Sequence, residues 1–319
     1  MNASVRAWLE HIGARGTQIL AASIFIGLLV PPLAAFLRPT LTAAVFLLLA
    51  IAMVRVELGA MRRLITAPLV PALAVVVIMI ATPLAVALAF ELWRPPPAVA
   101  LAIMFAASTA PIVSSPAISY LVGLDGPLSL GLLIAAMVLT PFIAPVFAEL
   151  VAGEALQISG FALALRLAGL LVGAALAAAL IRKVLGEARR ERLAGAIDGV
   201  NVLTLVVFAV ALMDGVSMTF LERPALVLGL TALAFALNLG LNLAGTLIFW
   251  RAGPRTATTI GFSSGNRNLA LIVGALGGQV PLETWIFFAV AQFPIYLMPA
   301  ILKPVYTRLI STGRARPAR

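Results

Sequence analysis

The stretch Gly261-Phe262-Ser263-Ser264-Gly265-Asn266-Arg267-Asn268-Leu269-Ala270 lies in the middle of an apolar segment that runs from about Thr256 to Leu276. Its residues from Ser263 to Asn268 are all polar or glycine, and one of them is an arginine. An arginine at bilayer depth is costly unless it is paired or faces a watery cavity. A broken backbone at that depth is tolerated only where it is buried in protein or lines a cavity. The stretch therefore predicts a binding site in the middle of a membrane.

The composition supports a membrane setting and excludes several classes of function. The chain has 319 residues, of which 62% are hydrophobic and only 11% charged. This balance is typical of a polytopic membrane protein. The chain has no cysteine, which excludes disulfides, thiolate metal sites and thiol nucleophiles. The single histidine, His11, precedes the first span and cannot form a multi-histidine metal site.

The apolar runs predict an all-α fold with ten membrane-spanning helices. Each run has about twenty or more largely apolar residues, the length needed to cross about 30 Å of hydrocarbon. The expected ranges are 17–37, 40–56, 66–90, 97–122, 127–151, 158–181, 194–213, 224–249, 256–278 and 284–307.

Lysines and arginines are distributed unequally over the loops between these spans. Seventeen of the 22 fall on the side of the N-terminus, whereas only Arg38, Arg94 and Arg223 fall on the other side. Arg166 and Arg267 lie inside spans. Because positive charge is enriched in cytoplasmic loops, the bias predicts an even number of spans and two cytoplasmic termini. It also explains the formal charge of +10 without a nucleic-acid partner.

The segment before the first span has a helical pattern. Val5, Trp8, Leu9 and Ile12 are spaced at i, i+3, i+4 and i+7. This spacing predicts a short amphipathic helix on the membrane surface, with a frayed tail as the alternative.

The two halves of the chain resemble each other. The fourth span is interrupted by Pro111 and Pro116, and the ninth by the opening stretch about 150 residues later. Five spans in each half require the second half to be inserted upside down, which is typical of inverted-repeat secondary transporters. The predicted segments are an N-terminal cytoplasmic segment 1–16, a first five-helix repeat 17–151, the start of the second repeat with a basic loop 152–193, its remainder 194–309, and a cytoplasmic tail 310–319.

The breaks supply the candidate ligands. Prolines free backbone carbonyls, which together with serine hydroxyls suit a hard cation, while the hydroxyls alone could donate to an anion. The alternative is a proline kink that neighbouring helices satisfy. Asn238 and Asn242, four residues apart, are expected to form interhelical hydrogen bonds. The candidate substrate- or ion-binding residues all have polar side chains in or beside the broken spans: Ser114, Ser115, Ser129, Ser263, Ser264, Asn266, Arg267, Asn268 and Gln292.

Three interpretations of Arg267 are open at this point. It could pair with Asp198 of the seventh span, or it could attract an anionic substrate. It could also act as a fixed internal cation where a mobile sodium would otherwise bind.

Together, the ten spans, the serine-rich and proline-broken fourth span and the Gly265–Leu271 sequence GNRNLAL resemble the bile acid:sodium symporter family. The resemblance runs from about Thr17 to Leu309. It implies a panel domain, 17–56 and 158–213, against a core domain, 66–151 and 224–309, with discontinuous helices four and nine crossing in the core. Alternating access then moves one domain against the other.

The sodium ligands of that family carry over only in part. Ser115 and Ser129 match serines that bind the first sodium, but Pro116 replaces an asparagine and Leu133 falls where a threonine is expected. Ser263 replaces the carboxylate that both sodium sites share, and Arg267 replaces a coordinating glutamine. The resemblance thus implies at most a weak sodium site at Ser115, Ser129 and Ser263, because no carboxylate compensates the arginine. No other cofactor is expected.

The leading hypothesis is a secondary carrier for a small organic anion in a bacterial-type inner (plasma) membrane. A sodium-coupled organic anion symporter with an altered ion site is the alternative. A passive channel fits paired discontinuous helices less well. A membrane-embedded enzyme is not expected, since the spans lack a nucleophile, base or metal constellation.

Overall fold

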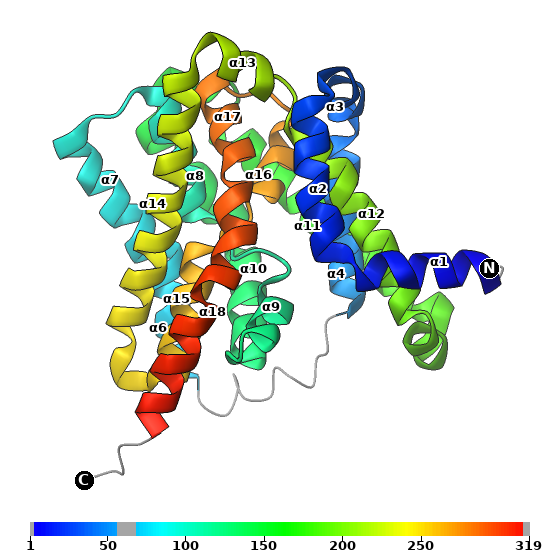
Figure 1. The fold of residues 1–319 in the computed structure, drawn as a ribbon. Coiled ribbons are helices and arrows are strands. Elements are labelled where there is room, and N and C mark those ends of the chain that lie inside the picture. The colour runs from blue at the N-terminus through cyan, green and yellow to red at the C-terminus, as the bar shows by residue number, and fades with distance from the viewer. Residues whose placement is uncertain (1–2, 56–67, 315–319) are drawn as a thin grey trace. The chain divides into compact units, whose positions relative to one another are not determined.

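The computed structural model describes residues 3–55 and 68–314 (Figure 1). These residues are almost entirely helical and form no strand, so the predicted all-α class is confirmed for them. The predicted loop between the second and third spans, and residues 315–319 of the predicted tail, lie outside this range. The chain divides into two compact units.

The first unit comprises Met1–Val56, Arg166–Val227 and Val273–Gln279. Its helices are α1 (Ala3–Ala14), α2 (Gly16–Leu29), α3 (Pro31–Leu37), α4 (Leu41–Arg55), most of α11 (Gly160–Arg192), α12 (Ala194–Leu212) and α13 (Val216–Glu222).

The second unit comprises Glu57–Leu165, Leu228–Ile272 and Val280–Arg319. Its helices are α6 (Leu69–Val76), the π-helical turn Val77–Ala81, α7 (Thr82–Trp93), α8 (Pro97–Ser108), α9 (Ser115–Leu121), α10 (Gly126–Ala152), most of α14 (Pro224–Ile248), α15 (Pro254–Gly265), the first half of α16 (Leu269–Leu276), α17 (Leu282–Val290) and α18 (Gln292–Arg314).

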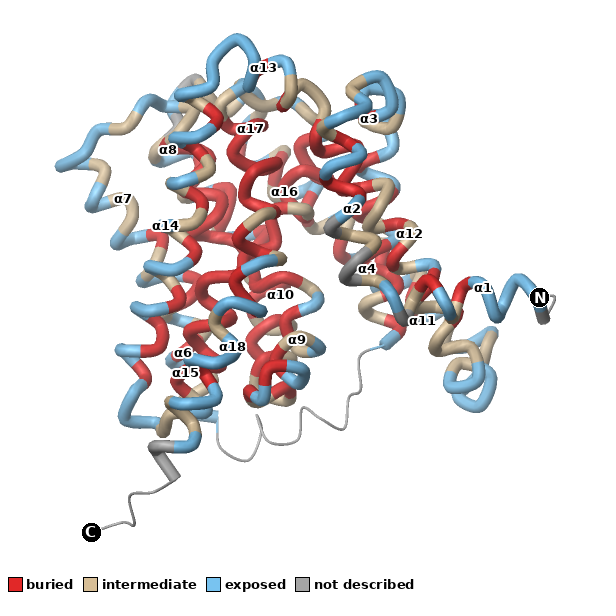
Figure 2. The backbone as a smooth tube through the Cα atoms, viewed as in Figure 1, coloured by how far each residue is buried: buried red, intermediate tan, exposed pale blue. Residues whose placement is uncertain are grey.

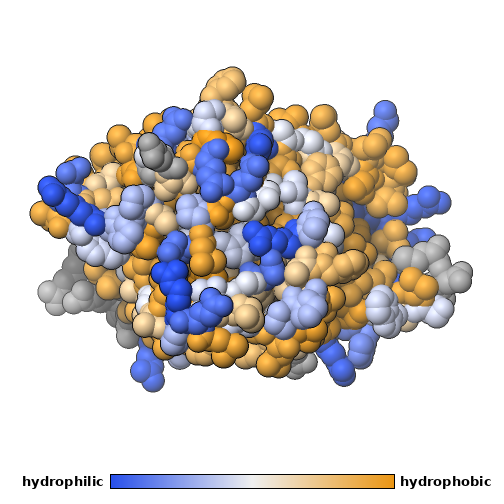
Figure 3. Space-filling model, turned by 90° about the horizontal axis from the view of Figure 1, so that it is seen from above, coloured by the Kyte–Doolittle hydropathy of each residue, from blue (hydrophilic) through white to orange (hydrophobic). Residues whose placement is uncertain are grey.

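Seven helical segments of the described residues are long and apolar enough to cross a membrane: Pro31–Arg55, Leu69–Trp93, Gly126–Val151, Gly160–Arg192, Ala194–Glu222, Pro224–Ile248 and Leu282–Ser311. Large apolar side chains also reach the surface over much of the face shown in Figure 3, with hydrophilic ones gathered in patches between them. These features indicate a multi-pass membrane protein.

Three of the ten predicted spans are not continuous helices. The first ends early, because α2 stops at Leu29 and a new helix begins at Pro31. The fourth and ninth are each divided into two short helices, α8 with α9 and α15 with α16. The ten-span inverted repeat, and the division into panel and core, stay predictions.

In the first unit, α1 packs closely on α12. Leu9 and Ile12 are buried, and a Cβ added to Gly199 would lie 2.2 Å from the Leu9 carbonyl oxygen. Glycines at 195 and 199 let the two helices approach in the manner of small-residue membrane interfaces. The frayed-tail alternative is therefore wrong for residues 3–14.

In the second unit, α14 and α15 are in near backbone contact. A Cβ added to Gly261 would lie 2.0 Å from Thr246 Oγ1, and one added to Gly265 would lie 2.5 Å from the Asn238 carbonyl oxygen. Figure 2 shows that α15, α16 and α17 are mostly buried, whereas α7 is largely exposed. Of the four half-helices, α8, α15 and α16 are thus mostly buried, as is tolerable for unwound backbone beside them, whereas α9 ends in exposed residues.

Candidate functional site

The two helix breaks pair with each other. An isolated antiparallel bridge joins Pro111, between α8 and α9, to Arg267, between α15 and α16. The Ile112 amide donates to the Asn266 carbonyl at 2.8 Å, and the Asn268 amide donates to the Ala110 carbonyl at 2.8 Å. Each break therefore provides hydrogen-bond partners for backbone groups of the other break that have none in their own helix. Such partners are needed because unpaired backbone groups are costly in a low-dielectric interior.

The local sequence explains where the helices stop and restart. Pro111 has no amide hydrogen to continue α8, and Pro116 lies in the first turn of α9, where a missing donor does no harm. Asn268 precedes α16, and its Oδ1 accepts from the Leu271 amide at 3.2 Å. This is the N-cap contact that asparagine favours.

Arg267 is 2% exposed and binds three backbone carbonyls. Its Nε donates to the Ser264 carbonyl at 2.6 Å, its Nη1 to the Thr109 carbonyl at 2.8 Å, and its Nη2 to the Ile78 carbonyl at 3.2 Å. Ser264 lies in the last turn of α15, and Thr109 follows the last residue of α8. The guanidinium thus connects the C-terminal ends of both half-helices to a third segment.

The third acceptor is a carbonyl that the chain leaves free. Ile78 lies in the π-helical turn Val77–Ala81, where the Thr82 amide bonds back to the Val77 carbonyl. In the same pattern, the Ile78 carbonyl would accept from the amide of residue 83. That residue is a proline and has no amide hydrogen. Ile78 was not a candidate from the sequence. The sequence signal for this free carbonyl is Pro83, which follows Thr82 in the middle of an apolar span.

Helix ends, and not a carboxylate, surround the Arg267 charge. Each helix C-terminus carries about half a negative elementary charge, so the ends of α8 and α15 together offset about one positive charge. Among the described residues, no acidic side chain forms an ion pair with Arg267. The suggested pairing with Asp198 is wrong, because Asp198 pairs with Arg55.

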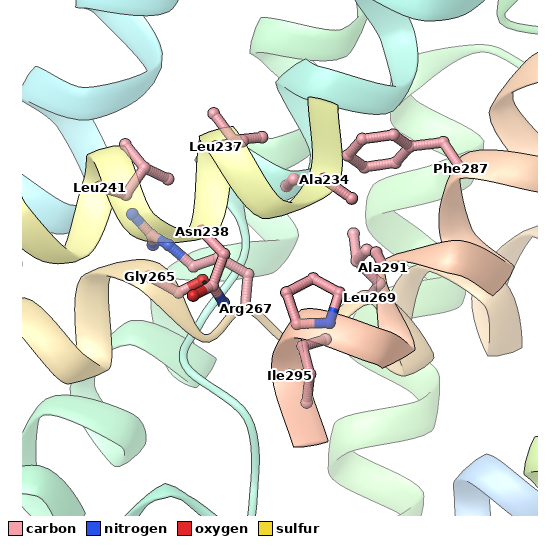
Figure 4. A pocket seen from close by; sticks show the side chains of 12 residues that line it. Ala234, Leu237, Asn238, Leu241, Gly265, Arg267, Leu269, Phe287, Ala291 and Ile295 are labelled. Carbon is pink, nitrogen blue, oxygen red and sulfur yellow. Dashed lines mark hydrogen bonds between the residues drawn. The ribbon is translucent and has the colours of Figure 1, made fainter. Parts of the chain in front are cut away.

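A small pocket lies beside Arg267 (Figure 4). It is lined by residues of α8, α14, α17 and α18 as well as the α15–α16 break, and it offers about 20 Å³ to water. Such a space holds a water molecule but no organic anion. Asn238 lines it, donating to the Gly265 carbonyl at 2.9 Å while its Oδ1 has no partner among the described residues. The guanidinium points to the Leu241 side of this pocket, away from Phe287 and Ile295.

The serine candidates occupy three different environments. Ser115 and Ser129 are fully buried, and their Oγ atoms lie 2.8 Å apart. Ser114, one residue earlier, is exposed. Ser263 is fully buried, and its Oγ has no partner among the described residues. The structure thus brings together two of the three residues of the implied sodium site.

The Ser115–Ser129 contact can be tested on its own. Ser115→Ala and Ser129→Ala are each expected to lower the free energy of unfolding by about 1 kcal/mol, because each leaves a buried hydroxyl unpaired. The double variant should cost less than the sum, since it removes both hydroxyls. A double-mutant cycle measured by unfolding in detergent checks this. Additive effects would show that the two hydroxyls do not interact.

The other candidates are mostly engaged in helix contacts. Ser264 Oγ donates to the Ile260 carbonyl at 2.8 Å, Asn266 Nδ2 to the Phe262 carbonyl at 3.0 Å, and Gln292 Nε2 to the Phe288 carbonyl at 3.2 Å. Asn268 Nδ2 is buried with no partner among the described residues. Asn242 Nδ2 donates to the Tyr306 hydroxyl at 2.6 Å, an interhelical bond of the expected kind.

No family model fits the chain, and no curated protein is significantly similar to it. The family resemblance of the sequence therefore stays a prediction.

Proposed function

We propose that this chain is a secondary transporter of a small organic anion that works by alternating access, with Arg267 in place of a coupling sodium. The proposal includes the ten-span inverted repeat and the likeness to the bile acid:sodium symporter family. One observation carries it: the guanidinium of Arg267 donates to carbonyls at the C-terminal ends of both half-helices.

Half-helix C-termini and unwound carbonyls are the groups that hold sodium in transporters with broken helices. Here the carbonyls of Ser264, Thr109 and Ile78 already accept from one covalently attached cation. A sodium ion at the same oxygens would face the guanidinium at close range, with no described carboxylate to offset the repulsion. This argues against a coupling sodium at the crossing.

The other ends of the broken helices favour an anion. The N-terminus of α16 carries partial positive charge. Beside it, Asn268 Nδ2 is a buried donor without a partner among the described residues, and the Ser263 hydroxyl is likewise unpaired. A carboxylate oxygen complements an amide N–H and a hydroxyl. Because Asn268 and Ser263 are both buried, a substrate needs a rearrangement to reach these donors, as alternating access provides.

The cation dependence of stability tests the role of Arg267. A ligand that binds only the folded state raises the unfolding temperature by mass action. The purified wild type should unfold at the same temperature in sodium, potassium and choline chloride of equal ionic strength. Arg267→Gln should gain a sodium-specific rise. Stabilisation of the wild type by sodium alone would contradict the proposal and favour the sodium-coupled symporter.

The proposed anion site is tested with a variant of Asn268 that keeps the N-cap contact of α16. Asn268→Asp retains an oxygen for the Leu271 amide but replaces the free donor with negative charge. Stabilisation by a panel of small carboxylates (acetate, lactate, pyruvate and benzoate) should occur in the wild type and in Asn201→Asp, the same change in the first unit, but not in Asn268→Asp.

Saturable uptake with counterflow in proteoliposomes distinguishes a carrier from a channel, and recovery of unaltered solute excludes an enzyme.

A further inference from the structure

The end of α11 is strongly basic and lies past the membrane-spanning part of the helix. Residues 182–192 contain five lysines and arginines against two glutamates, an excess of three positive charges. The 26 residues from Gly160 to Leu185 already span about 39 Å at 1.5 Å per residue. That exceeds the roughly 30 Å of a bilayer core. We call residues 182–192 the basic segment.

A glycine turns the basic segment instead of letting it extend away from the membrane. Gly186 has φ 67° and ψ 170°, which breaks the helix inside α11. Arg182 Nε and Arg190 Nη1 both donate to the Val54 carbonyl, each at 3.1 Å. Val54 lies at the C-terminal end of α4, where cationic donors are favoured. Two arginines therefore hold the segment against the end of a neighbouring helix.

The remaining cations of the basic segment stay free. Lys183, Arg189 and Arg192 are exposed, and their side chains have no ion pair or hydrogen bond with another described residue. Because Arg182 and Arg190 fix the backbone, these three charges are presented in a preorganised arrangement, which lowers the entropic cost of binding.

Helix α1 adds an apolar element to the same end of the first unit. It leaves the N-terminal end of α2 at a steep angle (Figure 1), and Gly195, just after the basic segment, lies against Glu10 of α1. While Leu9 is buried on α12, Trp8 is 55% exposed and Val5 48% exposed. Tryptophan is enriched at the headgroup level of membranes.

We propose that α1 and the basic segment together bind the headgroups of anionic phospholipids. Phosphatidylglycerol is the simplest lipid of this chemistry: its phosphate complements Lys183, Arg189 and Arg192, and its acyl region complements Trp8. Clusters of four to eight cations beside a membrane-spanning helix attract anionic lipid in this way. The proposal does not depend on Arg267 or on the transported substrate.

The test titrates the purified full-length protein, in a neutral maltoside detergent, with short-chain phosphatidylglycerol. The readout is the lipid concentration that gives half of the rise in unfolding temperature. The variant Lys183→Gln/Arg189→Gln/Arg192→Gln should raise this concentration about a hundredfold, since each cation near anionic lipid contributes about fivefold. Arg189→Gln and Arg192→Gln alone should each raise it about fivefold, which keeps the test available if the triple variant does not fold.

Two controls separate a specific surface from general charge. Arg251→Gln/Lys303→Gln/Arg308→Gln removes the same charge from the second unit and should leave the midpoint unchanged. Arg189→Lys/Arg192→Lys keeps the charge and should behave as the wild type. Three results would overturn the proposal: an unchanged midpoint in the Gln variants, an equal loss in either control, or equal stabilisation by phosphatidylcholine or by soluble glycerol phosphate.

Discussion

Replacing Arg267 with leucine is expected to lower the free energy of unfolding by about 3 kcal/mol or more. The change leaves the carbonyls of Ser264, Thr109 and Ile78 buried without their side-chain donor, and each such group costs about 1–3 kcal/mol. It also removes the cation that faces the C-terminal ends of α8 and α15. Unfolding in detergent, followed by heat or by chemical denaturant, measures the loss.

Arg255→Leu is the matched control. Arg255 also donates to a backbone carbonyl, that of Leu124 at 3.1 Å, but it is exposed, and its side chain makes this single hydrogen bond among the described residues. Its loss should cost no more than about 1 kcal/mol. Arg267→Lys should be intermediate, because an ammonium keeps the charge but lacks the planar fork that reaches three segments. Equal stability of Arg267→Leu and Arg255→Leu would contradict the account of Arg267 as a connection between three segments.

Gly261→Ala is expected to destabilise the second unit by about 3 kcal/mol, the upper part of the range for overpacking. The added Cβ would lie 2.0 Å from Thr246 Oγ1 and 2.4 Å from the Asn242 carbonyl oxygen. The hydroxyl cannot simply rotate away without cost, because it donates to that same carbonyl at 2.8 Å. Helices α14 and α15 must therefore move apart, which also shifts Asn238 from the Gly265 carbonyl.

Gly240→Ala serves as its control on the same helix pair. Gly240 is in α14, and an added Cβ there meets no atom within 4 Å. Alanine is the better helix former, so this variant should be as stable as the wild type or slightly more stable. The comparison is again unfolding in detergent. If both variants unfold alike, the close approach of α14 and α15 does not contribute to stability.

Much of the fold can be predicted from the sequence, because a membrane restricts the length and hydropathy of the helices that cross it. Apolar length predicts the long helices, and seven of the ten expected spans correspond to helical segments able to cross a bilayer. Pro111, Pro116 and the polar run at 263–268 predict the two breaks, since neither a missing donor nor a string of polar side chains suits a continuous span. The predicted first span is wrong in its end, because the apolar run continues past Pro31, where a new helix begins.

The partners of Arg267 show what the sequence leaves open. A buried arginine suggests an acidic partner, and Asp198 was the visible candidate, yet the acceptors are three carbonyls from segments 189, 158 and 3 residues away. Carbonyls carry no signature, because every residue has one. Only the fold determines which of them are left without a backbone donor.

The sequence by itself determined that the chain is helical, belongs in a membrane and is interrupted at two related places, because length, hydropathy and proline act locally. The tertiary structure decided how those interruptions are satisfied. It pairs the Ala110–Ile112 backbone with Asn266–Asn268 and directs the guanidinium of Arg267 to the ends of α8 and α15. These contacts form because packing brings unsatisfied backbone groups within hydrogen-bonding distance of a donor. Local sequence preferences do not determine which groups meet, since the partners are more than 150 positions apart in the chain.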